Sequence, residues 1–324
     1  IATLGKHSLA EGDTTTITLL VEGEGNIQDV ELFAPKVQDK FKVYPDQPQV
    51  EKSVIDNRTV LLAISQSGET ADTIAAIKKA KENGALALGI CNVVGSSIAR
   101  LTDHGIYTHA GPEIGVASTK AFTAQVTVLN MFALLLGRLK GLAKVHGKKI
   151  AESLAGLDTV VKSILSDTSQ IEKVAWKMEN ADNFLYLGRG LNFPVALEGA
   201  LKLKEISYIH AEVYPAAEMK HGPIALIDEN MPVVFVVTRT GYEKIVSNIQ
   251  EVKARGGKII IVTSALTEEL EELSEHIIEV SPIHKCLSSI ITSIPLQLLA
   301  YYIALLKGCD VDQPRNLAKS VTVE

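Results

Sequence analysis

The chain has 324 residues, of which 46% are hydrophobic and 22% are charged, and its formal net charge at pH 7 is −6. This length predicts two domains, because single hydrophobic cores stop growing at about 250–300 residues. The negative charge argues against a broad nucleic-acid surface but is compatible with a local anion pocket.

Neither cysteine usage nor hydropathy points outside the cytoplasm. Cys91, Cys286 and Cys309 are scattered and lack CxxC spacing, which predicts buried thiols in a reducing compartment and neither a disulfide framework nor a zinc site. No cationic and apolar signal sequence opens the chain. The most apolar stretch, residues 126–136, is too short for a membrane span and contains Thr127 and Asn130. We therefore expect a cytoplasmic protein without a membrane segment.

The first 57 residues predict strands without a helix. Residues 14–21 and 30–33 have strand-like patterns, and Pro35, Pro45 and Pro48 lie beyond them. This stretch has no helical period and no unit of strand, glycine loop and helix. We interpret residues 1–57 as a β-rich segment of unknown origin in front of an α/β body.

The segment SQSGET, residues 65–70, lies between the apolar run 60–64 and a stretch with helical periodicity at 71–81. Hydroxyls, an amide and a glycine therefore stand where a buried strand passes into a helix N-terminus, whose unpaired N–H groups and dipole favour a phosphate. The alternative is structural, with Thr70 or Ser67 acting only as the helix N-cap. From the residues alone these two interpretations have about equal weight.

An internal repeat appears when Gly68 is aligned with Gly241, because the same offset aligns Gly84 with Gly257. Each copy reads as strand, loop, helix and strand, the unit of a parallel, doubly wound sheet. We therefore predict an α/β protein with tandem doubly wound parallel sheets in a three-layer arrangement. Only the first copy has the hydroxyl-rich loop, which assigns phosphate binding to that copy.

Several helices and one strand are expected around the second copy. They are a long apolar helix at 119–139, one or two amphipathic helices at 148–180, a strand at 184–187, a helix at 194–208 and an extended tail from 310. The helix at 194–208 carries Glu198, Lys202 and Glu205 among small and apolar residues. Glu198 and Lys202 suit a surface ion pair at i,i+4, but Glu205 lies on the same face, and a charged stripe in so apolar a helix indicates a pocket.

Several motifs in one order give the chain a family resemblance. They are residues 64–70, GVASTKAF at 115–122, ALEGALKLKEISYIHAE at 196–212, MKHGP at 219–223 and DQPRNLAKSVTVE at 312–324. From about residue 57 onward the chain resembles the isomerase half of the glutamine–fructose-6-phosphate aminotransferase family, which consists of two sugar-isomerase (SIS) domains. The resemblance implies a first SIS domain at 58–165, a second at 166–309 and an active-site tail at 310–324.

The resemblance also implies a role for individual residues. Glu205 would be the base that moves a proton between adjacent carbons, assisted by Glu198 and Lys202. His221 would open the sugar ring, reaching into the partner subunit of a homodimer, and Lys319 would form a Schiff base with the open-chain ketose. His210 is expected to be structural, and Arg315 to anchor the tail. The implied sugar-phosphate contacts are Ser65, Gln66, Ser67, Thr70, Val116, Ser118 and Ala318.

These roles imply an enzyme of amino-sugar biosynthesis that converts fructose 6-phosphate and ammonia to glucosamine 6-phosphate without a metal or organic cofactor. Without ammonia, slow isomerisation to glucose 6-phosphate is expected. The alternatives are a non-catalytic sugar-phosphate-binding module and an inactive fragment or fusion. An imine-forming lysine argues against the first alternative, because binding alone does not need one.

Two parts of the family pattern do not match. The chain has no glutaminase domain, so we expect no glutamine hydrolysis from it. The opening strand of the first SIS domain and its CGTS phosphate loop are not found in residues 1–57. We therefore expect a truncated first SIS domain that keeps only part of the phosphate site.

Overall fold

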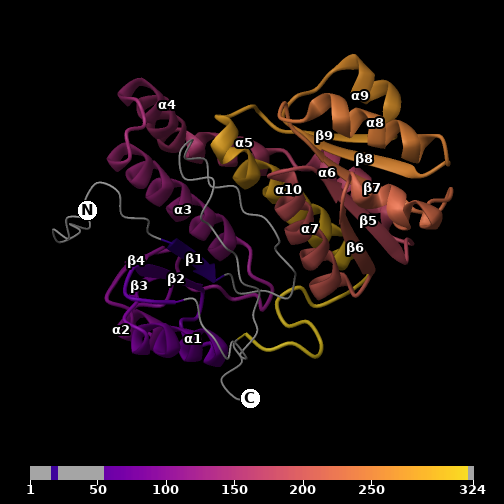
Figure 1. Cartoon of the computed structure of the whole chain (residues 1–324). Helices are drawn as coiled ribbons and strands as arrows, with labels where there is room; N and C mark the ends of the chain where they lie inside the picture. The colour runs from indigo at the N-terminus through magenta and orange to yellow at the C-terminus, as the bar shows by residue number, and fades with distance from the viewer. Residues whose placement is uncertain (1–15, 21–54, 320–324) are drawn as a thin grey trace. The chain divides into compact units, whose positions relative to one another are not determined.

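A computed structural model of the chain describes the backbone of residues 16–20 and all of residues 55–319 (Figure 1). The described residues form two compact units. The first contains residues 16–20, 55–113, 120–133 and 318–319, and the second contains residues 114–119 and 134–317. Each unit has its own parallel sheet.

The first unit contains four strands in the order β1-β2-β3-β4, and every neighbouring pair is parallel. Leu61 and Ala63 face the packed helices α1 and α2, whereas Leu62 and Ile64 face α3 on the opposite side. This alternation follows from the two-residue period of a strand, and it makes the unit a three-layer α/β/α sandwich. The elements are β1 (Thr16–Leu20), β2 (Thr59–Ser65), α1 (Ala71–Glu82), β3 (Leu86–Cys91), α2 (Ser97–Leu101), β4 (His104–Tyr107) and α3 (Lys120–Leu139).

Strand β1 changes the interpretation of the N-terminal segment. A strand was predicted over residues 14–21, and β1 confirms it. However, β1 pairs in parallel with β2 from Thr16↔Thr59 to Leu20↔Ala63, so it belongs to the first sheet and does not form a separate β-rich segment. The second predicted strand, at 30–33, lies outside the described residues. The domain boundary at residue 57 stays a prediction.

The second unit contains five parallel strands in the order β6-β5-β7-β8-β9. The order reverses between β5 and β7, which is the topological switch of a doubly wound sheet. Helices α6, α7 and α10 pack on one face and α8 and α9 on the other. The strands are β5 (Asn183–Gly188), β6 (His210–Pro215), β7 (Pro232–Val237), β8 (Lys258–Thr263) and β9 (His276–Glu279); the helices are α6 (Ser169–Met178), α7 (Asn192–Ser207), α8 (Tyr242–Lys253), α9 (Glu268–Leu273) and α10 (Ser288–Leu306).

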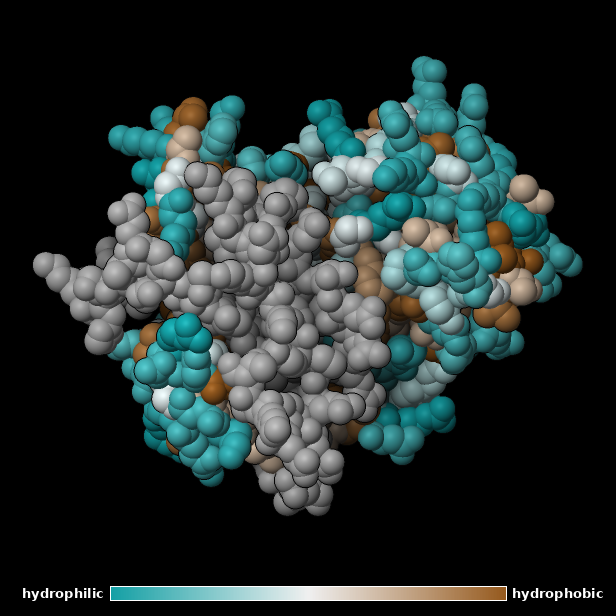
Figure 2. All heavy atoms as spheres, in the orientation of Figure 1, coloured by the Kyte–Doolittle hydropathy of each residue, from teal (hydrophilic) through white to brown (hydrophobic). Residues whose placement is uncertain are grey.

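Helices α8 and α9 of the second unit have a polar outer side and an apolar inner side. On the face shown in Figure 2, the outside of α8 and α9 is mainly hydrophilic, with apolar side chains scattered among polar ones. The inner sides of the same helices bury residues such as Ile249 and Leu270 against the sheet. Amphipathic helices of this kind cover a sheet and leave its polar face to water.

Residues 144–178 of the second unit contain three helices where one or two were predicted. They are α4 (Lys144–Ala155), α5 (Leu157–Ser166) and α6. Gly156 ends the first of them, and Asp167 separates the next two by accepting a hydrogen bond from the backbone N–H of Ser169. Local hydrogen bonding by glycine and aspartate ends helices without interrupting the apolar pattern that suggested one long element.

The repeat predicted from the glycines is confirmed. Gly68 follows β2 and Gly241 follows β7, and both have left-handed backbones, with φ of +68° and +74°. Helices α1 and α8 begin directly after these turns. The turn therefore demands glycine in both copies, because a side chain disfavours positive φ.

Two helical segments have the length and apolar composition of membrane spans, Lys120–Leu139 and Lys285–Leu306. This is weak support for a span, because core helices of globular proteins pass the same test. Helix α10, in the second segment, supplies Leu296, Leu299 and Ile303 to the core. Helix α3 is longer than the stretch judged from the sequence, and Val128, Leu129 and Phe132 pack on the first sheet.

Cys91, Cys286 and Cys309 form no disulfide. Cys91 is buried as predicted, whereas Cys286 and Cys309 are half-buried, so the prediction of buried thiols was wrong for these two. No group of three His, Cys, Asp or Glu side chains within the described residues is arranged to hold a metal ion.

Candidate active site

The loop at residues 65–70 arranges its hydroxyls as donors for an anion. The backbone N–H of Gly68 donates to Ser65 Oγ at 2.9 Å, and that of Glu69 donates to Ser67 Oγ at 3.2 Å. Because each hydroxyl oxygen already accepts a bond inside the loop, its own O–H proton can be donated elsewhere. Thr70 stands at the N-cap of α1, but its side chain makes no capping hydrogen bond. The capping interpretation of this loop therefore loses its main support.

The donors of this loop are electrically neutral. Residues 65–70 contain no lysine or arginine, so an anion here would be held by hydroxyls, the Gln66 amide and the N–H groups of the first turn of α1. Those N–H groups have no partner inside the helix and lie at the positive end of its dipole. Such an arrangement suits a phosphate group.

Residues 96–98, at the start of α2, hold this loop by two hydrogen bonds. The N–H of Ile98 donates to the carbonyl of Gly68 at 2.9 Å, and the N–H of Ser97 donates to Glu69 Oε1 at 2.8 Å. The hydrogen bond from Ser97 lowers the pKa of Glu69 below its ordinary value. The Glu69 carboxylate is therefore held as a hydrogen-bond acceptor by the first residue of α2. Ser96 is buried at 3% exposure, and its Oγ would lie 2.0 Å from a Cβ atom at position 68. Ser96 and Ser97 were not predicted from the sequence.

Helix α7 carries a buried cluster of charges, as the stripe predicted. Lys202 Nζ lies 2.7 Å from Glu205 Oε2, and these side chains are 5% and 23% exposed. Glu198 is 7% exposed, which excludes the surface ion pair considered from the sequence. The partner of Lys202 is Glu205 at i,i+3, whereas Glu198 Oε1 accepts a 2.9 Å hydrogen bond from Gln297 Nε2 of α10.

Burial raises the pKa of Glu198 to about 7, although Lys202 and the Gln297 hydrogen bond act in the opposite direction. A carboxyl group with such a pKa exchanges protons near neutral pH, which suits general acid–base chemistry. Its neighbours, an ammonium group and a second carboxylate, make this cluster the strongest candidate for a catalytic centre in the described residues.

The loop at 115–118 and the C-terminal tail are joined within the second unit. The N–H of Val116 donates to the carbonyl of Asp312 at 3.0 Å. Ala117 packs in the core of the unit, whereas Val116 and Ser118 are half-buried. The predicted contacts Val116 and Ser118 are thus held beside the tail.

Arg315 anchors the tail to the end of α7. Its backbone N–H donates to Tyr208 Oη at 2.9 Å, and its guanidinium carbon lies 4.2 Å from the centroid of the Tyr208 ring. Tyr208 has a left-handed φ of +62° at the C-cap of the helix.

The tail was predicted to be extended, but it bends at 311–313, where the N–H groups of Asp312 and Gln313 donate to Asp310 Oδ1, and turns at 315–316. It reaches Ala318, which is exposed, and Lys319, which is half-buried.

The two histidines of this region are exposed. His221 ends the short helix η1 (Glu218–His221), and its side chain is 74% exposed, 4.0 Å from Glu218 Oε2. His210 Nε2 lies 3.2 Å from Glu212 Oε1, an interaction that fits the predicted structural role. The loop residues 65–70 thus belong to the first unit, whereas the α7 cluster and His221 belong to the second.

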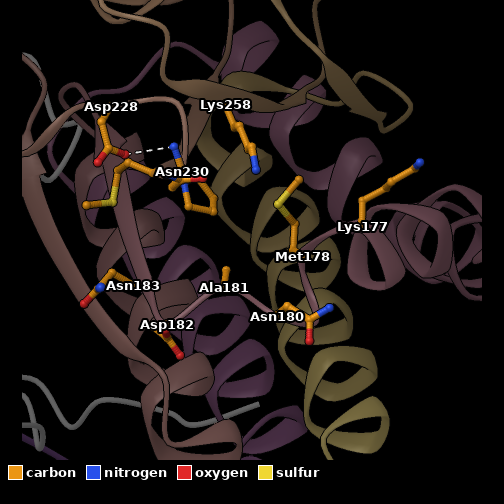
Figure 3. A pocket seen from close by; sticks show the side chains of 11 residues that line it. Lys177, Met178, Asn180, Ala181, Asp182, Asn183, Asp228, Asn230 and Lys258 are labelled. Atoms are coloured by element: carbon orange, nitrogen blue, oxygen red, sulfur yellow. Dashed lines mark hydrogen bonds between the residues drawn. The ribbon is translucent and has the colours of Figure 1, made fainter.

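A cavity of about 420 Å³ lies elsewhere in the second unit (Figure 3). It is lined by Asn183, Pro232 and Lys258, the first residues of β5, β7 and β8. Asp228 and Asn230 form a turn at its rim, where the Asn230 N–H donates to Asp228 Oδ1 at 2.8 Å. The cavity therefore lies at the amino ends of these strands, whereas ligands of doubly wound sheets bind at the carboxyl ends. None of the predicted site residues lines it.

The SIS-domain profile matches residues 38–135 and 177–307. The chain is 55% identical over 282 residues to a protein named glutamine–fructose-6-phosphate aminotransferase (isomerizing) from Chlorobaculum tepidum, covering 87% of this chain and 46% of that protein. A protein of the same name from Bacteroides thetaiotaomicron is 56% identical over 283 residues, covering 87% and 46%. The chain therefore spans about half the length of the curated relatives it matches.

A solved structure is similar over nearly the whole chain. It is the C-terminal domain of glucosamine–fructose-6-phosphate aminotransferase from Francisella tularensis, with a TM-score of 0.83 and 38% identity. The alignment covers 93% of this chain and 87% of that one. The predicted fold and the resemblance drawn from the motifs are both confirmed by these comparisons, but the match to the SIS-domain profile begins at residue 38 and not near residue 57.

Proposed function

The chain belongs to the SIS-domain family and corresponds to the isomerase half of its glutamine–fructose-6-phosphate aminotransferase members, and from this premise we propose that it acts on fructose 6-phosphate. With ammonia supplied, the product is glucosamine 6-phosphate; without it, the reaction is isomerisation to glucose 6-phosphate. The observation that carries the proposal is the buried cluster of Glu198, Lys202 and Glu205, because a binding module has no use for such a proton-exchanging centre.

In this proposal the loop at 65–70 holds the phosphate. Ser65, Ser67 and Thr70 donate their hydroxyl protons, and the Gln66 amide adds a further donor. The hydrogen bonds of Gly68 and Glu69 to the serine oxygens support this role, since they orient both hydroxyls. Val116, Ser118 and Ala318 line the sugar.

The proposed chemistry proceeds through an imine on the tail. His221 moves the proton that opens the ring, and we propose that it does so in the partner subunit of a homodimer. The neutral Lys319 amine attacks C2 of the ketose, and water leaves as the imine forms. Ammonia then displaces the Lys319 amine at the imine carbon, which restores the lysine and leaves the free C2 imine of the ketose. Glu205 takes a proton from C1 of this imine and returns one to C2, while Lys202 stabilises the carboxylate at 2.7 Å, and the product is the 2-amino aldose.

Without ammonia, water hydrolyses the imine and restores the lysine and the open-chain ketose. Glu205 then makes the same transfer from C1 to C2 on the ketose while one proton passes from the C1 hydroxyl to the C2 oxygen, which gives glucose 6-phosphate.

The proposed cellular setting is the cytoplasm. The three cysteines support it because none of them forms a disulfide, whereas secreted proteins commonly pair their thiols. No metal or organic cofactor is required by the proposed steps, because the imine and Glu205 together move the proton.

Borohydride trapping tests the function. The chain is incubated with fructose 6-phosphate, reduced, digested and analysed by mass spectrometry, with Lys319→Arg and unphosphorylated fructose as controls. We expect a reduced sugar-phosphate adduct on Lys319 that both controls lack. Binding of fructose 6-phosphate in equilibrium dialysis without any adduct would favour the non-catalytic module, and absence of both would mean an inactive chain.

A further inference from the structure

Helix α10 is almost entirely apolar, and its buried polar side chains use their hydrogen bonds differently. Thr292 Oγ1 donates to the carbonyl of Ser288, and Ser293 Oγ donates to that of Ile290, so both hydroxyls stay within their own helix. Gln297, at 8% exposure, instead donates out of the helix to Glu198 of α7. Packing alone does not explain why a buried amide in an apolar helix donates its hydrogen bond to a single carboxylate of the neighbouring helix.

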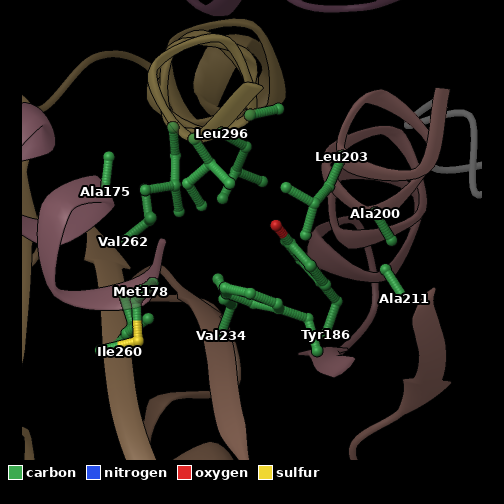
Figure 4. Packing of buried hydrophobic residues seen from close by; sticks show 14 of the residues in the cluster. Ala175, Met178, Tyr186, Ala200, Leu203, Ala211, Val234, Ile260, Val262 and Leu296 are labelled. Carbon is green, nitrogen blue, oxygen red and sulfur yellow. The ribbon is translucent and has the colours of Figure 1, made fainter. Parts of the chain in front are cut away.

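The two helices approach closely where this bond forms. A Cβ atom at Gly199 would lie 2.7 Å from Leu296 Cδ1 and 3.0 Å from Tyr186 Cε1. Only a glycine fits there, next to Glu198, just as Leu296 is next to Gln297. Figure 4 shows Tyr186 and Leu296 in this packing, with the Tyr186 hydroxyl surrounded by carbon atoms. The backbones thus hold Gln297 and Glu198 at a fixed separation.

We propose that Gln297 is a positioning residue of the α7 cluster: its amide N–H fixes Oε1 of Glu198 as an acceptor, so that only Oε2 exchanges a proton during the reaction. The hydrogen bond from the amide N–H stabilises negative charge on Oε1 and makes it the less basic of the two oxygens, so a proton is added preferentially to Oε2. Glu198 thereby gives and takes its proton at one fixed oxygen, whereas an unheld carboxyl group would rotate and could use either oxygen. This inference rests on the proposed isomerase function.

Within the described residues, the elements packed on α7 bring no charged side chain to Glu198 beyond those of α7 itself. Lys202 and Glu205 lie on the same helix, and α10 has no charged residue between Ser288 and Leu306. On β6, Glu212 is engaged with Tyr214 and His210. Strand β7 is apolar, and β5 contributes Tyr186, whose buried hydroxyl has no hydrogen-bond partner among the described residues. Gln297 is therefore the one uncharged donor that orients Glu198 within this part of the chain.

Two substitutions at Gln297 test the proposal. Gln297→Met keeps the length and bulk of the side chain but removes the donor, and Gln297→Glu restores a donor only while the new carboxyl group is protonated. Thr292→Val is the matched control, because it removes a buried hydroxyl from the same helix without touching Glu198.

The readouts are the pH profile of kcat for fructose 6-phosphate isomerisation and a carbon-13 NMR titration of the glutamate carboxyl groups. The Glu198 signal and its kinetic limb are identified by their loss in Glu198→Gln. We expect Gln297→Met to lower kcat about tenfold with unchanged KM. The pH midpoint of the Glu198 limb of the kcat profile and the midpoint of the Glu198 NMR titration should both move upward by roughly 1 pH unit, because the carboxylate loses a hydrogen-bond donor. Gln297→Glu should recover activity only at the acidic end, and Thr292→Val should match the parent.

Two results bear on different conclusions. If Gln297→Met lowers only the thermal midpoint while kcat, limb and NMR midpoint match the parent, Gln297 is structural and the inference is overturned. If the parent chain itself shows no isomerisation and no Lys319 adduct, the proposed function fails. In that case the NMR titration still decides whether Gln297 orients the Glu198 carboxyl group, because it needs no turnover.

Discussion

Gly68 and Gly241 occupy equivalent turns of the two repeats, and we predict that alanine has unequal effects at these positions. Both glycines have left-handed φ, so alanine costs about 1–2 kcal/mol at either site through backbone strain. At Gly241 nothing lies within 4 Å of the new Cβ atom. At Gly68 the new atom would lie 2.0 Å from Ser96 Oγ and 2.5 Å from Ser96 Cβ.

The overlap at Gly68 adds a second cost. Ser96 is buried at 3% exposure and precedes α2, whose first N–H groups hold Gly68 and Glu69. Overpacking of this kind costs about 1–3 kcal/mol. We therefore expect Gly68→Ala to lose about 2–5 kcal/mol of unfolding free energy, and Gly241→Ala about 1–2 kcal/mol. Since the displaced loop carries the proposed phosphate donors, Gly68→Ala should also raise KM for fructose 6-phosphate by about tenfold or more.

Urea unfolding measures the two losses. Trp176, the single tryptophan, lies in the second unit, so its fluorescence follows that unit while circular dichroism follows both. The decisive variant is Gly68→Ala combined with Ser96→Gly, which removes both overlapping atoms and should recover about 1–3 kcal/mol relative to Gly68→Ala. Equal losses at Gly68 and Gly241, together with no recovery in the double variant, would refute the role assigned to Ser96.

Three further predictions follow from the α7 cluster and the tail. Burial raises the pKa of Glu198 from 4.5 to about 7, so its contribution to stability is present below pH 4.5 and is lost between pH 4.5 and 7, by about 3 kcal/mol in total; urea unfolding of Glu198→Gln at pH 5 and 7.5 should show a smaller difference than the parent. Lys202→Met leaves Glu205 and Glu198 without their cation and should cost about 3 kcal/mol at pH 8 but less at pH 5, where the raised pKa of Glu198 leaves that carboxyl group neutral; an equal cost at both pH values would contradict this. Arg315→Ala removes a stacking interaction of about 0.5–1 kcal/mol, so it should leave the thermal midpoint within 2 °C, roughly the shift of a sub-kcal/mol change, while slowing formation of the Lys319 adduct several-fold; an unchanged rate would show that the anchor does not matter.

The sequence predicted those features that are written in local patterns. The glycine turn after β2, the helix behind it and the charged face of α7 all follow from neighbouring residues with strand or helix periodicity. The register of the ion pair did not follow, because Glu198 and Glu205 lie on the same side of Lys202 in projection, and only the side-chain rotamers select i,i+3 over i,i+4.

Contacts between distant parts of the chain were beyond sequence reasoning. Residues 96–98 read as an ordinary turn and helix start, and nothing local marks them as the support of a loop 28 positions earlier. Gln297 reads as an isolated polar residue in an apolar helix. Strand β1 was recognised as a strand, but its parallel pairing with β2 was not, because the residues that join them give no helical signal.

The stacking of Arg315 on Tyr208 makes the proposed nucleophile a tethered reagent. Lys319 follows this anchor by four residues, so the extended backbone carries it no more than about 14 Å from the clamp. A group confined to a sphere of that radius has an effective concentration on the order of 0.1 M, far above any concentration of free lysine in a cell. The chain connection to the end of α7 thus keeps the Lys319 amine at a local concentration that a freely diffusing amine would not reach.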